Sequence, residues 1–401
     1  MSFSIRRTAA AAAPAAGYYA AFIALGLTTA SLGPTLTGLA ENTGSTLQQI
    51  SVLFLARSFG YLSGSLFGGR MFDRLNGGNR IMAAALLLMA LCAAVTPGIV
   101  SLTLLAVLLF VLGMGEGVLD VGGNTLIVWT YRERTAPFMS ALHFFYGVGA
   151  LLSPIVVANA LLTTGSIAWG YRAIALLVLP AVAVLLLRKG PSSPFQNGAE
   201  KPVAGQRPPL TAAPAALLVG LIVAFYFLFA GSESAFSSWI STYTYSLGMA
   251  DQAGAAYLNS LFWGIFTLGR LAAIPISIRV KPGLMLVGDF VLCTLGLGII
   301  LLWPGSLGLL RLGVGLVGLG MASGFPMILT VAERRLQLTG QITALFFVGM
   351  SAGAMIIPSL IGLLFERVGP VVMMLVILFA LLLSAAVYGI IEWVSTRQKT
   401  V

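Results

Sequence analysis

Long apolar stretches follow one another along nearly the whole chain, and they limit what it can fold into. About 20 consecutive apolar residues cross a bilayer as a helix. Of the 401 residues, 58% are hydrophobic and 8% are charged, whereas a soluble domain averages about 25% charged residues. The sequence therefore predicts an all-α polytopic membrane protein. We expect twelve spans, at residues 17–39, 47–70, 80–96, 100–130, 138–162, 171–189, 213–240, 252–277, 284–303, 307–332, 340–365 and 370–394.

Basic residues gather on one side of these spans. Seventeen of the 22 Lys and Arg residues fall in the two termini or in the even-numbered connections. This bias predicts that both termini are cytoplasmic. We expect the protein to lie in the cytoplasmic (inner) membrane. Arg6 and Arg7 are followed by alanines rather than by a signal-peptide pattern, so we expect the membrane domain to begin with the first span.

Two similar halves are predicted, joined by a linker. Residues 190–212 are rich in Pro, Gly, Ser and Gln and indicate a flexible cytoplasmic linker between bundles at 1–189 and 213–401. Gly149–Pro154 in the fifth span matches Gly353–Pro358 in the eleventh. The layout resembles the major facilitator superfamily, whose two six-helix bundles hold the substrate between them at mid-membrane.

Acidic residues interrupt the fourth span. Glu116, Asp120 and Asn124 are spaced i, i+4, i+8, so they share one helix face. A carboxylate at mid-membrane costs about 2.5–3.5 kcal/mol on insertion scales, which favours a functional role. We predict cation coupling by Asp120 and Glu116, with a possible Na⁺ site at Asp120. The alternative is a pair of acids that only fixes helix packing.

Other polar residues inside spans have two interpretations each. Arg57 is expected to pair with Glu116 or Asp120, for structure or for gating. His143 is either a hydrogen-bonded packing residue or a third coupling group, since its ordinary pKa is about 6.5. Glu233 binds hydroxyls or a cation, or it caps a helix break at Gly231.

A substrate with hydroxyl groups needs hydrogen-bond partners and an aromatic face. Asn124 can bond a sugar hydroxyl or the neighbouring carboxylate, or form an interhelical hydrogen bond. Many aromatic residues in the second half are expected to be core or lipid-facing. The predicted substrate-binding residues are Asn124, Tyr146, Glu233, Asn259, Trp263 and Phe347.

Gly69–Arg74, after the second span, resembles the superfamily's loop motif Gly-x-Leu-x-Asp-Arg. The resemblance implies that Gly69 allows close helix approach and that Asp73 sits at the N-terminus of the eleventh span as a conformational latch. Arg74 belongs to the same motif. Arg270, near the inner end of the eighth span, is similarly expected to have a structural or latch role.

A narrower resemblance covers nearly the whole chain. Leu119–Asn124 is similar to the fourth-span motif of the fucose permease group, and more so to the sodium-dependent glucose transporters. Gly33–Thr35, Ala56–Tyr61, Ala141–His143 and Phe262–Gly264 also resemble that branch. Fucose permease has an acid in its first span, which this sequence lacks, so a role for that acid cannot be transferred.

The expected function is cation-coupled symport of a monosaccharide such as a hexose, with Na⁺ or H⁺. The alternative is a proton-coupled efflux antiporter for apolar compounds. No Walker loop, Gly-x-Ser-x-Gly or His-Glu-x-x-His motif is present, so we expect no enzyme and no cofactor. The basic residues follow the positive-inside pattern, so we expect no nucleic-acid partner. Cys92 and Cys293 lie in apolar runs and are expected to be core residues. The expected partners are the lipid bilayer, the sugar and the cation, with a monomeric protein.

Overall fold

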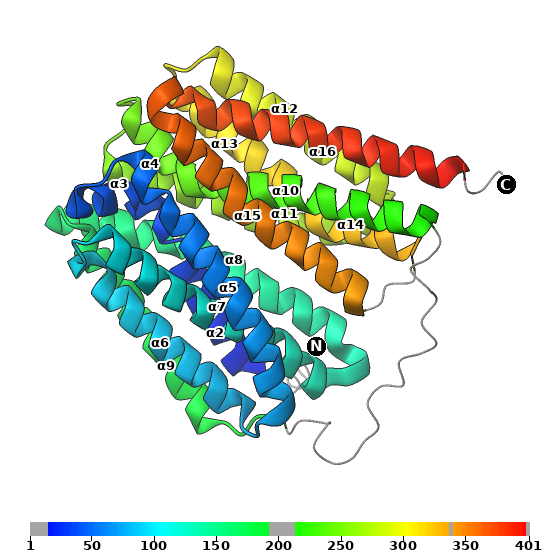
Figure 1. Ribbon diagram of the computed structural model, residues 1–401, viewed down its shortest axis with the longest axis horizontal. Helices are drawn as coiled ribbons and strands as arrows, with labels where there is room; N and C mark the ends of the chain where they lie inside the picture. The colour runs from blue at the N-terminus through cyan, green and yellow to red at the C-terminus, as the bar shows by residue number, and fades with distance from the viewer. Residues whose placement is uncertain (1–14, 192–212, 337–339, 398–401) are drawn as a thin grey trace, which may run out of the picture. The chain divides into compact units, whose positions relative to one another are not determined.

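The computed structural model describes residues 15–191, 213–336 and 340–397, and long helices account for most of them (Figure 1). Most of the predicted linker lies outside these ranges. The helices before it are α2 (Ala16–Thr29), α3 (Leu32–Thr43), α4 (Leu47–Ile50), α5 (Val52–Arg74), α6 (Gly78–Val95), α7 (Leu102–Tyr131), α8 (Thr135–Thr164) and α9 (Ile167–Leu187). Those after it are α10 (Ala213–Ser246), α11 (Gln252–Arg279), α12 (Pro282–Leu302), α13 (Leu307–Met321), α14 (Gly324–Glu333), α15 (Gly340–Val368) and α16 (Val371–Arg397).

These helices have the length and composition of membrane spans. The described residues contain 11 helices that are long and apolar enough to cross a bilayer, or up to 12 when α2 and α3 are taken as one bent span. The predicted fold class is therefore confirmed, and the protein is an integral membrane protein. The first span, predicted as one helix over 17–39, is in fact two helices bent by 43°.

The chain forms two compact units. The N-terminal unit comprises residues 1–44 and 59–205, and the C-terminal unit comprises 45–58 and 206–401. The segment Ser45–Ser58 is thus part of the C-terminal unit although it comes early in the sequence. Its Leu47 N–H donates to Glu366 Oε1 on α15 at 2.7 Å, and its Phe54 ring lies 5.9 Å from the Trp239 ring. The predicted bundles at 1–189 and 213–401 stay a prediction.

Two spans are broken shortly before a proline. Pro34 is the third residue of α3, and Pro326 is the third residue of α14. Proline has no N–H, and its ring clashes with the carbonyl group four residues earlier, here that of Ala30 and Ala322. The preceding helices accordingly end at Thr29 and Met321. Each break also carries a serine, Ser31 or Ser323.

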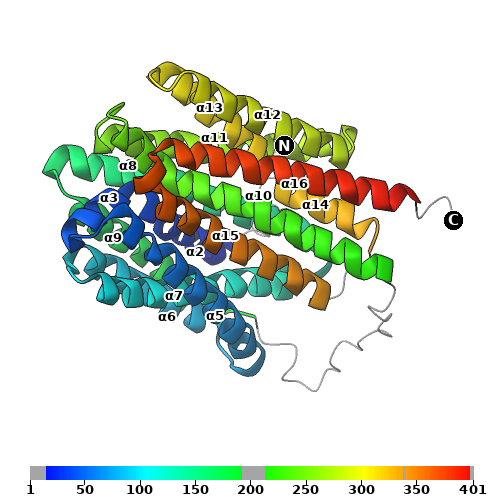
Figure 2. The same cartoon turned by 45° about the horizontal axis from the view of Figure 1, so that its top comes forward.

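Glycines set the closest helix contacts, and they do so alike in both units. A Cβ on Gly149 of α8 would lie 2.0 Å from the Ile23 carbonyl oxygen on α2. One on Gly353 of α15 would lie 1.9 Å from the Phe227 carbonyl oxygen on α10. Figure 2 shows α10 and α15 side by side along most of their length. The two repeated glycine–proline motifs therefore occupy equivalent positions in the two units.

Helices α5 and α7 meet in the same way. Cβ atoms on Gly60 and Gly64 would lie 1.9 Å and 2.1 Å from the carbonyl oxygens of Phe110 and Met114. A Cβ on Gly117 would lie 2.1 Å from the Tyr61 carbonyl oxygen. These contacts hold the acidic face of α7 against α5.

We predict that Gly353→Ala destabilises the protein, whereas Gly389→Ala on α16 does not. The added methyl group at position 353 meets backbone, so α10 and α15 must separate, and overpacking of this kind typically costs about 1–3 kcal/mol. At Gly389 a Cβ meets no atom within 4 Å. The midpoints of thermal unfolding in detergent measure the difference, and equal midpoints for the two variants would contradict the assigned contact.

Candidate functional site

Asp120 lies on α7 and receives hydrogen bonds at both carboxylate oxygens. The Tyr61 hydroxyl on α5 donates to Oδ2 at 2.5 Å. The Asn124 side-chain amide donates to Oδ1 at 3.0 Å and also to the Asp120 backbone carbonyl at 2.9 Å. Hydrogen bonds to an ionised group are among the stronger ones in proteins. Hydroxyl and amide donors thus stabilise this carboxylate inside the helical bundle, and of the alternatives for Asn124 the bond to the neighbouring carboxylate is present.

Glu116 lies one turn earlier and is buried, with 3% of its surface exposed. The Thr29 hydroxyl, in the last residue of α2, donates to Glu116 Oε1 at 3.3 Å. Because Thr29 adjoins the break between α2 and α3, this contact links an acid of the fourth span to the bend in the first span. Glu116 and Asp120 therefore have different donors, on different helices.

Helix α8 contributes the remaining predicted residues of the N-terminal unit. Tyr146 is half-buried and close enough to Tyr61 for an electrostatic interaction. The His143 ring packs edge-on against Phe22, with ring centroids 5.8 Å apart. Phe22 in turn occupies the space beside Gly123 of α7. Both residues therefore flank the helix that carries the acids, and their roles in coupling and in binding stay predictions.

The C-terminal unit contains a buried polar and aromatic group on α11. The Asn259 amide donates to the Ser237 carbonyl on α10 at 2.6 Å. Its Oδ1 is buried without a hydrogen-bond partner, as is the Ser260 hydroxyl. Trp263 lies one turn further along, with Phe262 and Phe266 each 5.3 Å from its ring. An unused acceptor and donor beside an indole ring suit a ligand that has hydroxyl groups.

Glu233 and Arg270 lie within electrostatic range of each other in the C-terminal unit. The Arg270 guanidinium stacks over the Phe266 ring at 4.4 Å. Helix α10 continues unbroken through Gly231, so the alternative that Glu233 caps a break there is wrong. Phe347 on α15 is 48% exposed, with its ring 6.3 Å from that of Phe325.

The residues of the loop motif lie at the end of α5. Asp73 and Arg74 are exposed. A Cβ on Gly69 meets no atom of the described residues within 4 Å, so Gly60, Gly64 and Gly117 make the close contacts instead. The latch between Asp73 and the eleventh span stays a prediction, as does the pairing of Arg57 with Glu116 or Asp120.

Four residues of these polar contacts were not predicted from the sequence. They are the acid Asp289 and three hydrogen-bond donors to acids, Tyr61, Thr29 and Ser323. Tyr61 and Thr29 become partners of the acids only through helix packing, although Tyr61 ends the Ala56–Tyr61 motif. Asp289 on α12 is 6% exposed and accepts a hydrogen bond from Ser323 at 2.6 Å. The sequence did contain a signal for Asp289, because this residue is an acid inside a predicted membrane span.

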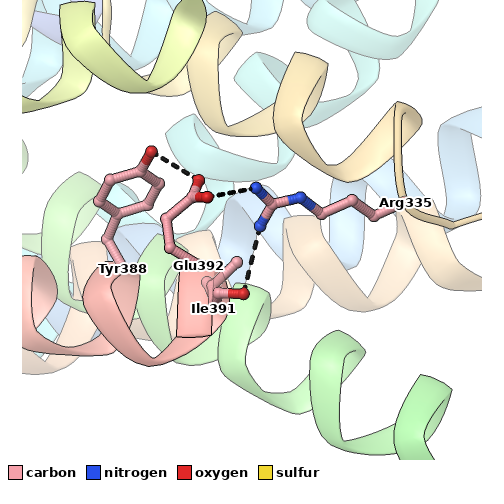
Figure 3. A network of polar contacts seen from close by, with 4 residues as sticks. All are labelled: Arg335, Tyr388, Ile391 and Glu392. Atoms are coloured by element: carbon pink, nitrogen blue, oxygen red, sulfur yellow. Dashed lines mark hydrogen bonds and ion pairs between the residues drawn. The ribbon is translucent and has the colours of Figure 1, made fainter. Parts of the chain in front are cut away.

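A second polar cluster joins the ends of α14 and α16 (Figure 3). Arg335 forms an ion pair with Glu392 at 2.7 Å and donates to the Ile391 carbonyl at 3.2 Å. The Tyr388 hydroxyl donates to the other carboxylate oxygen of Glu392 at 2.7 Å. A Cβ on Gly283, at the start of α12, would lie 2.3 Å from that hydroxyl oxygen. The cluster thus ties three helix ends together and is structural.

The described residues contain no cluster of side chains typical of a metal site. Within residues 15–191, 213–336 and 340–397, no group of three or more His, Cys, Asp or Glu side chains could hold a metal ion. Cys92 and Cys293 are free and buried, which confirms the prediction that they are core residues. The possible Na⁺ site at Asp120 stays a prediction.

Comparison with known families places most of the chain in one of them. Residues 18–358 match the family model described as Major Facilitator Superfamily. The sodium-dependent glucose transporter 1 of Xenopus laevis is 32% identical over 84% of this chain and 72% of its own length. The sodium-dependent glucose transporter 1A of Mus musculus is 31% identical over 86% of this chain and 88% of its own length.

Solved structures share the fold at low sequence identity. A D-xylose-proton symporter has a TM-score of 0.71 at 13% identity and covers 93% of this chain and 96% of its own. A nucleoside transporter has a TM-score of 0.74 at 12% identity over 94% and 98% of the two chains. These likenesses concern the helical architecture alone.

We predict that Tyr61 and Asp120 stabilise each other. A hydrogen bond to a charged group contributes about 1.5–3 kcal/mol, and a double-mutant cycle isolates it. Tyr61→Phe and Asp120→Asn should therefore show a coupling energy of about 1–3 kcal/mol in unfolding measurements in detergent. Tyr171→Phe, which removes a hydroxyl bonded to Thr35, is the control and should be additive with Asp120→Asn. A Tyr61–Asp120 pair that is equally additive would refute the interaction.

Proposed function

Since the chain belongs to the major facilitator superfamily, we propose that it is a secondary transporter that carries a monosaccharide together with Na⁺ or H⁺. The family and the helices support a membrane transporter rather than an enzyme. Two relatives above 30% identity are named sodium-dependent glucose transporters, which favours a sugar as substrate and a cation as its partner. A monomer in the inner membrane, with both termini cytoplasmic, is part of the proposal.

The hydrogen-bonded carboxylate of Asp120 carries this proposal. Tyr61 and Asn124 hold it in one orientation without a basic side chain at its oxygens in the described residues. A proton or a Na⁺ ion arriving at Asp120 would therefore change the net charge of the site. Desolvation penalises the charged form of a carboxyl group. The neutralised site is therefore easier to shield from water while the protein changes between its outward-open and inward-open states.

Each unit by itself offers groups that suit the hydroxyls of a sugar. The Asn124 amide and the Tyr61 hydroxyl can turn from the carboxylate to a sugar hydroxyl once a cation has neutralised Asp120. In the C-terminal unit, Asn259 Oδ1 and the Ser260 hydroxyl supply an unused acceptor and donor, and the Trp263 ring supplies an apolar face. Sugar and cation would then favour each other's binding, as thermodynamic linkage requires.

The test is transport by purified protein in liposomes, with a panel of hexoses and with Na⁺ and pH gradients varied separately. Wild-type protein should show sugar counterflow, and one of the two gradients should drive accumulation. If no sugar exchanges, and an apolar compound leaves the vesicles in response to a pH gradient, the efflux alternative takes the place of this proposal.

We predict that Asp120→Asn retains sugar counterflow but loses accumulation against a gradient, because the amide imitates a permanently neutral acid. Glu116→Gln should be milder, since Glu116 lies one turn farther from Asn124. Glu41→Gln, at an exposed acid near the end of α3, is the matched control and should behave as wild type. If Asp120→Asn still concentrates sugar with the wild-type dependence on Na⁺ or pH, Asp120 is not the coupling group.

A further inference from the structure

Asp289 is a buried acid to which the proposed function gives no role. It lies in the first half of α12 and is 6% exposed. Within the described residues its one hydrogen-bond partner is Ser323, whose hydroxyl donates to Oδ2 at 2.6 Å. No Lys or Arg there forms an ion pair with it. An isolated carboxylate in a membrane-spanning helix is costly, so its charge must be compensated in another way.

Helices α12 and α13 pack closely beside Asp289. A Cβ on Gly320 of α13 would lie 2.7 Å from the Asp289 backbone oxygen and 2.8 Å from Cys293 Sγ. The α12 and α13 backbones therefore touch at the level of the acid. A Na⁺ ion prefers several oxygen ligands, as hard cations do, and the described residues contain no group of three or more His, Cys, Asp or Glu side chains that could hold a metal ion. A proton needs only the carboxylate and one neighbour.

The position of Ser323 connects the acid to a helix break. Ser323 lies between α13 and α14 and is 4% exposed. Pro326 has no N–H, so the Ala322 carbonyl lacks the helical donor four residues ahead of it. An ionised Asp289 accepts the hydrogen of Ser323. A protonated Asp289 instead donates its own hydrogen to Ser323 Oγ, and the serine hydrogen becomes available to a backbone carbonyl. Ser31 makes such a bond to the Thr28 carbonyl at the other break.

We propose that Asp289 is a proton-binding group of the C-terminal unit, distinct from Asp120, and that Ser323 senses whether the proton is present. The titratable groups within electrostatic range are Cys293, one turn away on α12, and through it Glu233 on α10. On the other packed helices, Arg311 of α13 and Glu333 of α14 are exposed, and Tyr388 and Glu392 of α16 belong to the Arg335 cluster. A role for this proton in each transport cycle rests on the proposed cation-coupled function, but proton binding itself does not.

Infrared difference spectroscopy of the full-length protein in liposomes tests the proposal without sugar. A buried carboxylic acid gives a C=O stretching band when it is protonated, and the band disappears as the group ionises. Wild-type protein should show such a band, titrating with pH. Asp289→Asn should lose it, whereas Asp120→Asn should retain it. Glu392→Gln, which removes an acid already paired with Arg335, is the matched control and should also retain it.

Ser323→Ala keeps the test decisive if Asp289→Asn does not fold. Loss of the hydrogen bond should shift both the frequency of the band and the midpoint of its titration. A band unchanged in Asp289→Asn or in Ser323→Ala would overturn the proposal. Removal of the band by Na⁺ at constant pH, but not by K⁺, would also overturn it, because Asp289 would then bind the metal ion. Absence of sugar transport would contradict the proposed function and leave the titration result intact.

Discussion

A carboxylate buried among membrane-spanning helices needs partners from the protein itself, and here hydroxyl and amide groups supply them. Asp120 has Tyr61 and Asn124, and Asp289 has Ser323. Such donors stabilise the ionised form but do not cancel its charge, unlike an Arg or Lys in a buried ion pair. The ion pair of Arg335 with Glu392 is partly exposed and lies at helix ends, where it joins elements together. Acids without a permanent counter-charge are the ones whose charge state can change.

The two units share a close glycine contact and a span broken before a proline, but the broken spans and the acids are not at equivalent positions. Each has a close glycine contact between its first and fifth spans, α2 with α8 and α10 with α15. Each also has a span broken by a proline three residues into its second part, but these spans are not equivalent. In the N-terminal unit the break is in the first span and the acids lie on the unbroken α7. In the C-terminal unit the break lies between α13 and α14, and the acid lies on α12. Duplication of the scaffold has therefore been followed by divergence of the polar interior.

The helices were predictable because hydrophobicity alone determines them: the expected span 252–277 is α11, Gln252–Arg279. The pattern of Glu116, Asp120 and Asn124 was also predictable, since helical spacing puts all three on one face. Tyr61 and Thr29 were not, because their contacts depend on which helices pack against α7. Pro34 indicated the bend after Thr29, but the bend was not predicted. The apolar run continues through this region, and a proline in the first turn of a helix is compatible with such a run. Asp289 was not predicted because it is a single acid without a helical pattern of polar residues, and its partner Ser323 comes from between α13 and α14.

The burial of both cysteines has a practical consequence. Cys92 is 3% exposed and Cys293 is fully buried. A polar maleimide reagent would therefore reach an introduced surface thiol long before it reached either native one. Fluorescent or spin probes could be attached at chosen sites on the two units without first replacing the native cysteines, and the distances between such probes would report which side of the membrane the transport pathway faces.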